Sequence, residues 1–305
     1  MSVGVRAASV FIMAITIMLV ATTSTTSGQG PTYQAVDAWA GLPAGMQWGA
    51  VTSASSDVDG NVYVFRRGDP PILKFDGHGS LVKSLGAEMF VSAHGMRVDP
   101  QGMLWATDVR GHVVYKLDRD GHVLLTLGKK GVSGDGPDTF NGPTDVLTAP
   151  NGDIFVTDGQ FNSRVVRFSA DGRFIKAWGT KGTDPGQFKV PHAIAMDSTG
   201  RLFVADRDNG RIEIFDQDGK FLAEWTQFGP PSGIFISNDD TLYVAAIGDK
   251  SGLIIGSAKN GRTYDFIPIP AKGVNGPHLV SADSHGAVYV ADLLASQVRK
   301  FVRHP

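Results

Sequence analysis

Three histidines in this 305-residue chain, His94, His192 and His278, have the residue type and the spacing of a metal site. Each lies eight residues before a glycine that immediately precedes an apolar, strand-like run. Three imidazoles with no fourth protein ligand are typical of catalytic Zn²⁺ sites, in which the open position takes water or substrate. Ligand type alone leaves iron, copper and nickel open. A bound metal would polarise a substrate oxygen or lower its pKa towards neutrality.

A packing role is the alternative interpretation of these histidines, with each ring satisfied by backbone carbonyls. The sequence contains no cysteine, so no thiolate is available as a ligand or nucleophile, and no disulfide crosslinks the fold. A metal site in this chain must therefore use His, Asp or Glu. The remaining histidines fall in predicted turns or in the tail and are expected to be solvated: His78, His112, His122, His285 and His304.

The elements that must position the three histidines recur six times along the chain. The most regular element is an apolar run of the type Leu-Tyr-Val-Ala-Asp, which is expected to be the second strand of each unit. The six runs are 61–65, 103–107, 153–157, 201–205, 241–245 and 287–291. Successive runs lie 40–50 residues apart, and four short strands fit this period. The sequence therefore predicts an all-β fold, a six-bladed β-propeller.

Third strands and the turns after them support the same repeat. They are predicted at 72–76, 113–118, 164–169, 211–216 and 297–302, and the fifth unit is degenerate. Most are followed by Gly-containing turns such as Asp120-Gly121 and Asp171-Gly172, which supply the positive φ of a tight hairpin. The sixth unit has no fourth strand of its own, and the segment 33–39 resembles one. We expect this N-terminal segment to pair with the C-terminal strand and close the ring; a single unpaired leader strand is the alternative.

The histidines occupy one register of the repeat. Counting back eight residues from the turn residue of each unit gives Thr52, His94, Thr144, His192, Ser232 and His278 in chain order. Histidine thus falls in units two, four and six, with small hydroxyl residues between. Since alternate blades of a six-bladed ring lie 120° apart, the three side chains are expected to converge on the central channel.

Residues 1–29 are predicted to be a signal peptide, and residues 30–305 to form the propeller. Arg6 precedes an apolar run from Ala7 to about Ala21, which is shorter than the roughly 20 residues of a membrane-spanning helix. An uncleaved N-terminal anchor is the alternative. The mature protein is expected to be secreted or periplasmic, without a membrane span. A net charge of −2 with no basic block argues against a nucleic-acid partner, and the oligomeric state is left open.

Several segments of the chain resemble a known family. They are NVYVFRRGD at 61–69, HGMRVDPQGMLWATD at 94–108, PTDVLTAPNGDIFVTDGQFNS at 143–163, PHAIAMDSTGRLFVADRDNGRI at 191–212, and 277–292. The units resemble NHL repeats, which many propellers share. The ordered set Arg-Gly-Asp, His-Gly, Pro-Thr-Asp, Pro-His and Pro-His is more specific. On these segments the whole mature chain is similar to the peptidyl-α-hydroxyglycine α-amidating lyases (peptidylamidoglycolate lyases).

The resemblance implies a reaction and a set of site residues. Members cleave the carbon–nitrogen bond of a C-terminal α-hydroxyglycine and release an amide and glyoxylate. Their zinc binds to three histidines, which match those identified above. Their active-site arginines match Arg67 and Arg207, which would hold a substrate carboxylate. The alternatives for these arginines are ion pairs with Asp69 and Asp208, respectively.

Two positions depart from the family pattern. Gln160 stands where the family has a tyrosine proposed as catalytic base, and an amide cannot accept and return a proton at useful pH. Gln160 is therefore assigned to substrate binding. Leu279 stands where the family has an aspartate that helps to bind a structural Ca²⁺, which makes calcium doubtful here.

The sequence is compatible with three functions. The first is an exported zinc-dependent lyase of the amidating type, acting on a peptide or small molecule with a C-terminal hydroxyglycine-like group. The second is a different metallohydrolase on the same propeller, such as a lactonase-like enzyme. The third is a non-catalytic NHL propeller that binds a ligand.

Overall fold

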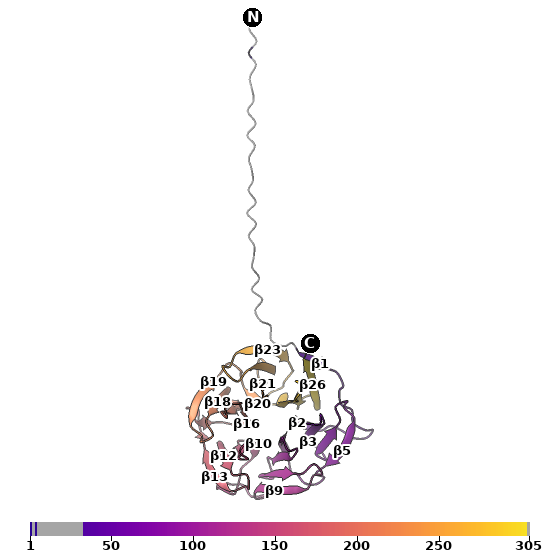
Figure 1. The fold of residues 1–305 in the computed structure, drawn as a ribbon, viewed down its shortest axis with the longest axis vertical. Helices are drawn as coiled ribbons and strands as arrows, with labels where there is room; N and C mark the ends of the chain where they lie inside the picture. The colour runs from indigo at the N-terminus through magenta and orange to yellow at the C-terminus, as the bar shows by residue number, and fades with distance from the viewer. Residues whose placement is uncertain (2–3, 5–32, 304–305) are drawn as a thin grey trace.

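The computed structural model describes residues 33–303, together with Met1 and Gly4; the predicted signal peptide lies outside the described residues. Six four-stranded antiparallel sheets surround a central channel (Figure 1), which confirms the predicted six-bladed β-propeller. Helical structure in this part of the chain is limited to one 3₁₀ turn, η1 (Arg207–Asn209), and no described helix is long and apolar enough to cross a membrane.

Each blade has four strands, and in blades 1 to 5 they follow one another outward from the channel in chain order. Blade 1 contains β2 (Ala50–Ser56), β3 (Val62–Arg67), β4 (Ile72–Phe75) and β5 (Leu81–Leu85). Blade 2 contains β6 (Ala93–Val98), β7 (Leu104–Asp108), β8 (Val113–Leu117) and β9 (Val123–Gly128). Blade 3 contains β10 (Pro143–Thr148), β11 (Ile154–Asp158), β12 (Arg164–Phe168) and β13 (Phe174–Trp178).

The second half of the ring repeats this arrangement. Blade 4 contains β16 (Pro191–Met196), β17 (Leu202–Asp206), β18 (Arg211–Phe215) and β19 (Phe221–Trp225). Blade 5 contains β20 (Pro231–Ile236), β21 (Thr241–Ala246), β22 (Gly252–Ser257) and β23 (Thr263–Pro268). Blade 6 contains β24 (Pro277–Ala282), β25 (Val288–Asp292), β26 (Gln297–Arg303) and β1 (Tyr33–Val36). The short strands β14 (Thr180–Lys181) and β15 (Gln187–Phe188) pair in the loop between blades 3 and 4.

Burial explains why the second strands read as apolar runs. Strands β7, β11, β17 and β25 are buried along their full length, because adjacent blades cover both faces of each sheet. The outer strand β19 instead alternates between intermediate and exposed residues. The core is therefore a series of apolar layers between neighbouring blades. One such layer joins blade 4, through Phe203, to blade 5, through Ile234 and Val244.

Positive φ angles explain the turn residue of the repeat. The first two strands of each blade meet in a turn whose last residue is left-handed, with φ of 80° at Gly102 and 83° at Gly200. Glycine adopts this conformation without steric cost. In blade 5 the equivalent residue, Asp240, has a φ of 63°. The fifth unit therefore keeps the turn although its sequence has drifted.

The chain ends close the ring as predicted. Strand β1 pairs antiparallel with β26, with Tyr33 opposite Arg303. Trp39 follows this strand and packs its ring against Tyr289 of blade 6 and Phe75 of blade 1, with centroids 5.3 and 6.0 Å apart. Blade 6 is thereby completed by the N-terminal segment and joined to blade 1.

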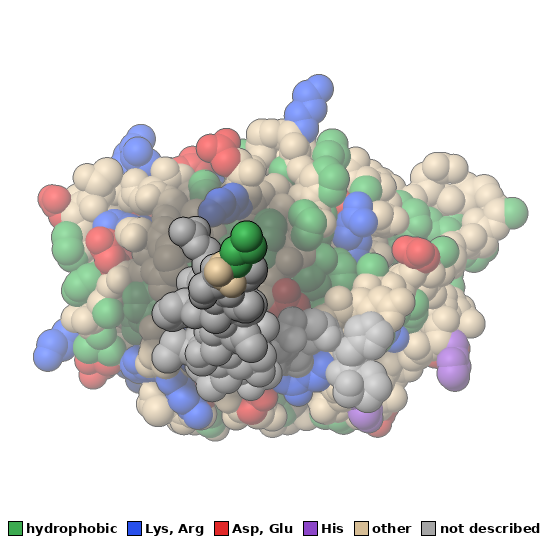
Figure 2. Space-filling view, turned by 90° about the horizontal axis from the view of Figure 1, so that it is seen from above, with side chains coloured by type: hydrophobic (Ala, Val, Ile, Leu, Met, Phe, Trp, Pro, Cys, Tyr) green, Lys and Arg blue, Asp and Glu red, His purple; other side chains and the backbone are tan. Residues whose placement is uncertain are grey.

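Lysine, arginine and acidic side chains are interspersed over the edge of the disc (Figure 2). No single-sign patch is seen on this face, in keeping with the net charge of −2.

A β-bulge lies at the same place in all six blades. Pairing between the first and second strands shifts register at the position counted from the sequence, for example between Ala93 and Met96, between Pro191 and Ala193, and between Pro277 and Val280. Bulges re-aim a side chain relative to the regular pleat. The six register residues therefore lie at the bulges, where side-chain direction departs from the regular pleat of the strands.

Candidate metal and substrate site

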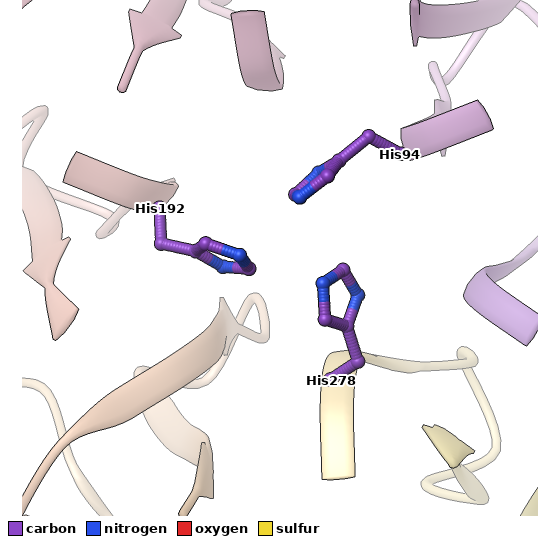
Figure 3. A group of neighbouring side chains, drawn as sticks. All are labelled: His94, His192 and His278. Carbon is purple, nitrogen blue, oxygen red and sulfur yellow. The ribbon is translucent and has the colours of Figure 1, made fainter. Parts of the chain in front are cut away.

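The three register histidines meet in the channel. Figure 3 shows His94, His192 and His278 approaching from three blades, with their rings turned toward one another. Each pair of ring centroids is 4.8 Å apart, and all three side chains are almost fully buried. One nitrogen from each ring lies within 4.8 Å of the others. The threefold convergence expected from the repeat is therefore present.

The register residues between the histidines orient the rings. His94 Nδ1 lies 2.8 Å from the carbonyl oxygen of Thr144, and His192 Nδ1 lies 2.5 Å from that of Ser232. His278 Nδ1 lies 2.6 Å from the carbonyl oxygen of Thr52. A carbonyl can only accept, so each Nδ1 carries the proton and each Nε2 keeps its lone pair. This second contact is the usual way in which a protein fixes a metal-binding imidazole.

Charge and burial keep the three rings neutral. Burial and, to a smaller extent, the positive charges of Arg67 and Arg207 lower the pKa of His278 to about 3. Burial likewise lowers the pKa of His94 and His192 well below the usual value. Metal binding requires the neutral imidazole. Three neutral imidazoles whose Nε2 atoms keep their lone pairs fit Zn²⁺. The alternative packing role explains the hydrogen bonds of the Nδ1 atoms and leaves the convergence of the three rings unexplained.

Glycine 95 offers a test of this orientation. A Cβ at Gly95 would lie 2.4 Å from the carbonyl oxygen of Thr144, the acceptor for His94 Nδ1. We expect Gly95→Ala to weaken zinc binding about 10- to 100-fold, the usual effect of losing an outer-shell partner, measured by competition with a chelator. Gly41→Ala, where the added Cβ meets nothing within 4 Å, is the control. Equal affinity in the two variants would contradict the assigned role of the Thr144 carbonyl.

All six residues predicted from the sequence line one cavity of about 240 Å³. Arg67 and Arg207 occupy equivalent positions in blades 1 and 4. Each follows the residue that pairs with the start of the first strand: Arg66 pairs with Val51 in blade 1, and Asp206 pairs with Pro191 in blade 4. The two arginines thus project from blades 1 and 4, on opposite sides of the six-bladed channel.

The two arginines have different local partners. Arg67 Nε donates to the carbonyl oxygen of Ala93 at 3.2 Å, next to His94, and no pair with Asp69 occurs among the described residues. Arg207 Nε donates to Asp208 Oδ1 at 2.8 Å, so the predicted alternative pair exists while Arg207 also lines the cavity. A guanidinium at each position can still present free N–H groups to a carboxylate.

Gln160 and Arg110 occupy equivalent positions in neighbouring blades. Each is the second residue after a buried aspartate that ends the second strand, Asp158 or Asp108, and both line the cavity. Sequence reasoning identified Gln160 and missed Arg110. The shared offset from the buried aspartate is the signal that could have found it.

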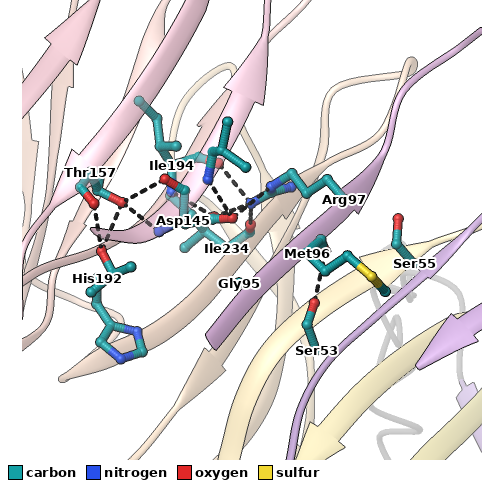
Figure 4. Close-up of polar contacts among 12 residues, drawn as sticks. Ser53, Ser55, Gly95, Met96, Arg97, Asp145, Thr157, His192, Ile194 and Ile234 are labelled. Carbon is teal, nitrogen blue, oxygen red and sulfur yellow. Dashed lines mark hydrogen bonds and ion pairs between the residues drawn. The ribbon is translucent and has the colours of Figure 1, made fainter. Parts of the chain in front are cut away.

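An ion pair joins the innermost strands of two neighbouring blades, beyond the histidines along those strands (Figure 4). Arg97, three residues beyond His94 on β6, binds Asp145 of blade 3 through Nε at 3.1 Å and Nη2 at 2.5 Å. Its Nη2 also donates to the carbonyl oxygens of Ile194 in blade 4 and Ile234 in blade 5. One guanidinium therefore ties four blades together.

The residues of this region do not fit the calcium that the resemblance suggested. Leu279 is buried and packs in the apolar layer with Ile234, so it offers no oxygen ligand. Arg97 adds a positive charge to the channel. These residues therefore do not form a calcium site of the kind that the resemblance implied.

The side chain of His112 is half-buried and its Nδ1 is enclosed, so the prediction that it is solvated was wrong. His304 lies outside the described residues.

Comparison with known proteins agrees with this architecture. The NHL repeat model matches residues 188–215. Human NHL repeat-containing protein 3 is 34% identical over 82% of this chain and 78% of its own length. A probable peptidyl-alpha-hydroxyglycine alpha-amidating lyase of Caenorhabditis elegans is 32% identical over 72% of this chain and 66% of its own. The chain belongs to this family of NHL-repeat propellers.

Other members of the family are larger. Peptidyl-glycine alpha-amidating monooxygenase B of Xenopus laevis is 33% identical over 86% of this chain, which spans about a third (35%) of that protein. Among solved structures, virginiamycin B lyase of Staphylococcus aureus superposes with a TM-score of 0.62 at 18% identity, covering 90% of this chain and 88% of that one. That likeness supports the propeller fold alone.

Proposed function

We propose that this chain is an exported, zinc-dependent lyase of the peptidyl-α-hydroxyglycine amidating type. The observation that carries the proposal is the cavity in which three neutral imidazoles lie between arginines from opposite blades. The names of its relatives support the reaction class. In the reaction the carbon–nitrogen bond breaks, the hydroxyl carbon becomes the aldehyde of glyoxylate, and the nitrogen leaves as an amide. The hydroxyl proton is lost and the nitrogen gains one, so no oxidant is needed.

The residues of the chain divide the work. His94, His192 and His278 would hold Zn²⁺, which supplies Lewis acidity towards the oxygen of the substrate when bound. Arg67 and Arg207 bind the carboxylate of the hydroxyglycine unit, which fixes the scissile carbon next to the histidines. Gln160 donates a hydrogen bond to the amide portion of the substrate or accepts one from it, and it transfers no proton. Proton exchange therefore passes to solvent at the cavity mouth, and the rate is expected to be low.

The proposal is tested directly with the purified mature protein. We expect about one zinc per chain and release of glyoxylate from α-hydroxyhippurate, measured with a carbonyl reagent. A protein without stoichiometric metal, or a metal-loaded protein that releases no glyoxylate from any α-hydroxyglycine derivative, would refute the lyase. Stoichiometric metal with hydrolysis of an ester or lactone instead would point to the metallohydrolase.

Gln160 provides a gain-of-function prediction. Gln160→Tyr places a phenol that can exchange protons at the cavity, and general acid–base catalysis contributes roughly 10²–10⁴-fold when well positioned. We expect kcat for glyoxylate release to rise about 10- to 100-fold. Gln160→Phe, which has the ring but no hydroxyl, is the matched control and should not exceed the native rate. A tyrosine variant no faster than the phenylalanine variant would show that the missing base does not limit the rate.

A further inference from the structure

The charge of the cavity is unbalanced. Its lining contains three arginines, Arg67, Arg110 and Arg207, and no carboxylate. Asp208, which lies outside the lining, pairs with Arg207. Arg67 donates to a backbone carbonyl only, and Arg110 has no hydrogen bond or ion pair among residues 33–303. Two positive charges are therefore uncompensated, and the single carboxylate of a hydroxyglycine unit neutralises one of them.

The backbone that carries Arg110 is fixed while its side chain is free. Asp108, buried at the end of β7, accepts the backbone N–H groups of Ser92 and Gly111 through Oδ1, both at 2.8 Å. The N–H of Val109 donates to the carbonyl oxygen of Ser92 at 3.0 Å. Arg110 lies within this pinned turn and is exposed. The turn thus presents an unpaired guanidinium to the cavity with little loss of backbone entropy on binding.

Arg110 lies at the outer part of the cavity, and the histidines lie at its buried part. Arg110 is exposed, whereas His94 is 2% exposed. Partial burial lowers the pKa of Arg67, and the positive charge of the nearby Arg110 lowers it further. The two guanidinium groups are therefore close enough to interact. The exposed apolar side chains Phe161 and Val274 also line the cavity. A ligand anchored at the histidines would therefore extend past apolar groups towards Arg110.

We propose that Arg110 binds a second carboxylate on the acyl part of the substrate and makes the site selective for acidic α-hydroxyglycine derivatives. This inference deepens the proposed lyase function and rests on it for the identity of the first carboxylate. The substrate class is an N-acyl hydroxyglycine, including a peptide, whose acyl side carries a carboxylate beyond a short apolar portion. Arg110 is then a specificity residue that contacts the part of the substrate released as the amide.

Equilibrium binding tests this selectivity without turnover. Hippurate and 4-carboxyhippurate lack the hydroxyl group, so neither can react, and they differ by one carboxylate. We expect the zinc-loaded protein to bind 4-carboxyhippurate about fivefold more tightly, the range of an exposed ion pair, and the preference to shrink at high salt. In Arg110→Ala the ratio of the two dissociation constants should approach one, and in Arg110→Glu it should invert. Arg119→Ala, an exposed arginine of the same blade that lies outside the cavity lining, should keep the native ratio.

The outcomes separate this inference from the lyase itself. A native ratio near one, or a ratio that Arg110→Glu leaves unchanged, overturns the second carboxylate subsite even in an active lyase. An Arg110-dependent ratio in a protein that releases no glyoxylate supports the subsite and refutes the proposed reaction.

Discussion

Replacing His192 with alanine is expected to abolish stoichiometric metal binding. The variant leaves two imidazoles, fewer than the three protein ligands that catalytic zinc sites use, so zinc affinity is expected to fall steeply. Metal analysis after dialysis should fall from about one zinc per chain to a trace, and glyoxylate release should fall with it. His122→Ala is the control, because that side chain is 78% exposed and pairs with Asp118 in a turn.

Folding of the His192 variant must be checked separately. His192 is 1% exposed and its Nδ1 donates to the carbonyl oxygen of Ser232, which the alanine leaves without this partner. That loss costs about 1–3 kcal/mol. His192→Gln refills most of the volume and can restore a donor, yet the amide is a poor zinc ligand. Full zinc occupancy in both variants, with native circular dichroism, would contradict the assigned metal site.

The sequence predicted what depends on the repeat. Comparing the units along the chain was enough to predict three features of the fold. These are the six blades, the closure of the ring by β1, and the shared register of His94, His192 and His278. Counting succeeds because each blade repeats the same bulge, so equal offsets in sequence become equal positions in the ring. Strand bounds were less exact, and β3 extends to Arg67 rather than ending at residue 65.

Contacts between blades could not be predicted in this way. Arg97 meets Asp145, 48 residues away, and the carbonyl oxygens of Ile194 and Ile234, which are farther still. No periodic pattern marks such a pair, since it occurs in only one register of the ring. The sequence also could not predict which backbone carbonyls accept from the histidine Nδ1 atoms, because every residue has a carbonyl.

The two departures from the family pattern now differ in their consequences. Leu279 belongs to an apolar layer with Ile234, and its effect is to remove an oxygen ligand from the channel. Gln160 lies in the cavity itself, beside the residues proposed to hold the substrate. Leu279 therefore affects how the ring is stabilised, whereas Gln160 affects the rate of the proposed reaction.

Substitution of the opposed arginines is expected to have the second large effect. Arg67→Ala and Arg207→Ala should each lower kcat/KM for α-hydroxyhippurate about 10²-fold, because a charged hydrogen-bonded contact to the carboxylate contributes roughly 1.5–3 kcal/mol. The double variant should fall further than either single variant. Arg173→Ala, 82% exposed on blade 3, is the control and should retain native kinetics.

Lysine in place of either arginine distinguishes a bidentate contact from simple charge. A guanidinium binds a carboxylate with two parallel N–H groups, whereas an ammonium is a point charge. We therefore expect Arg67→Lys and Arg207→Lys to recover less than a tenth of the activity lost in the alanine variants. Zinc content should stay near one per chain in all four, since neither side chain is a ligand. Full rescue by lysine would show that the field of the cavity, rather than a shaped carboxylate site, holds the substrate, and loss of zinc would assign the arginines to the support of the histidines.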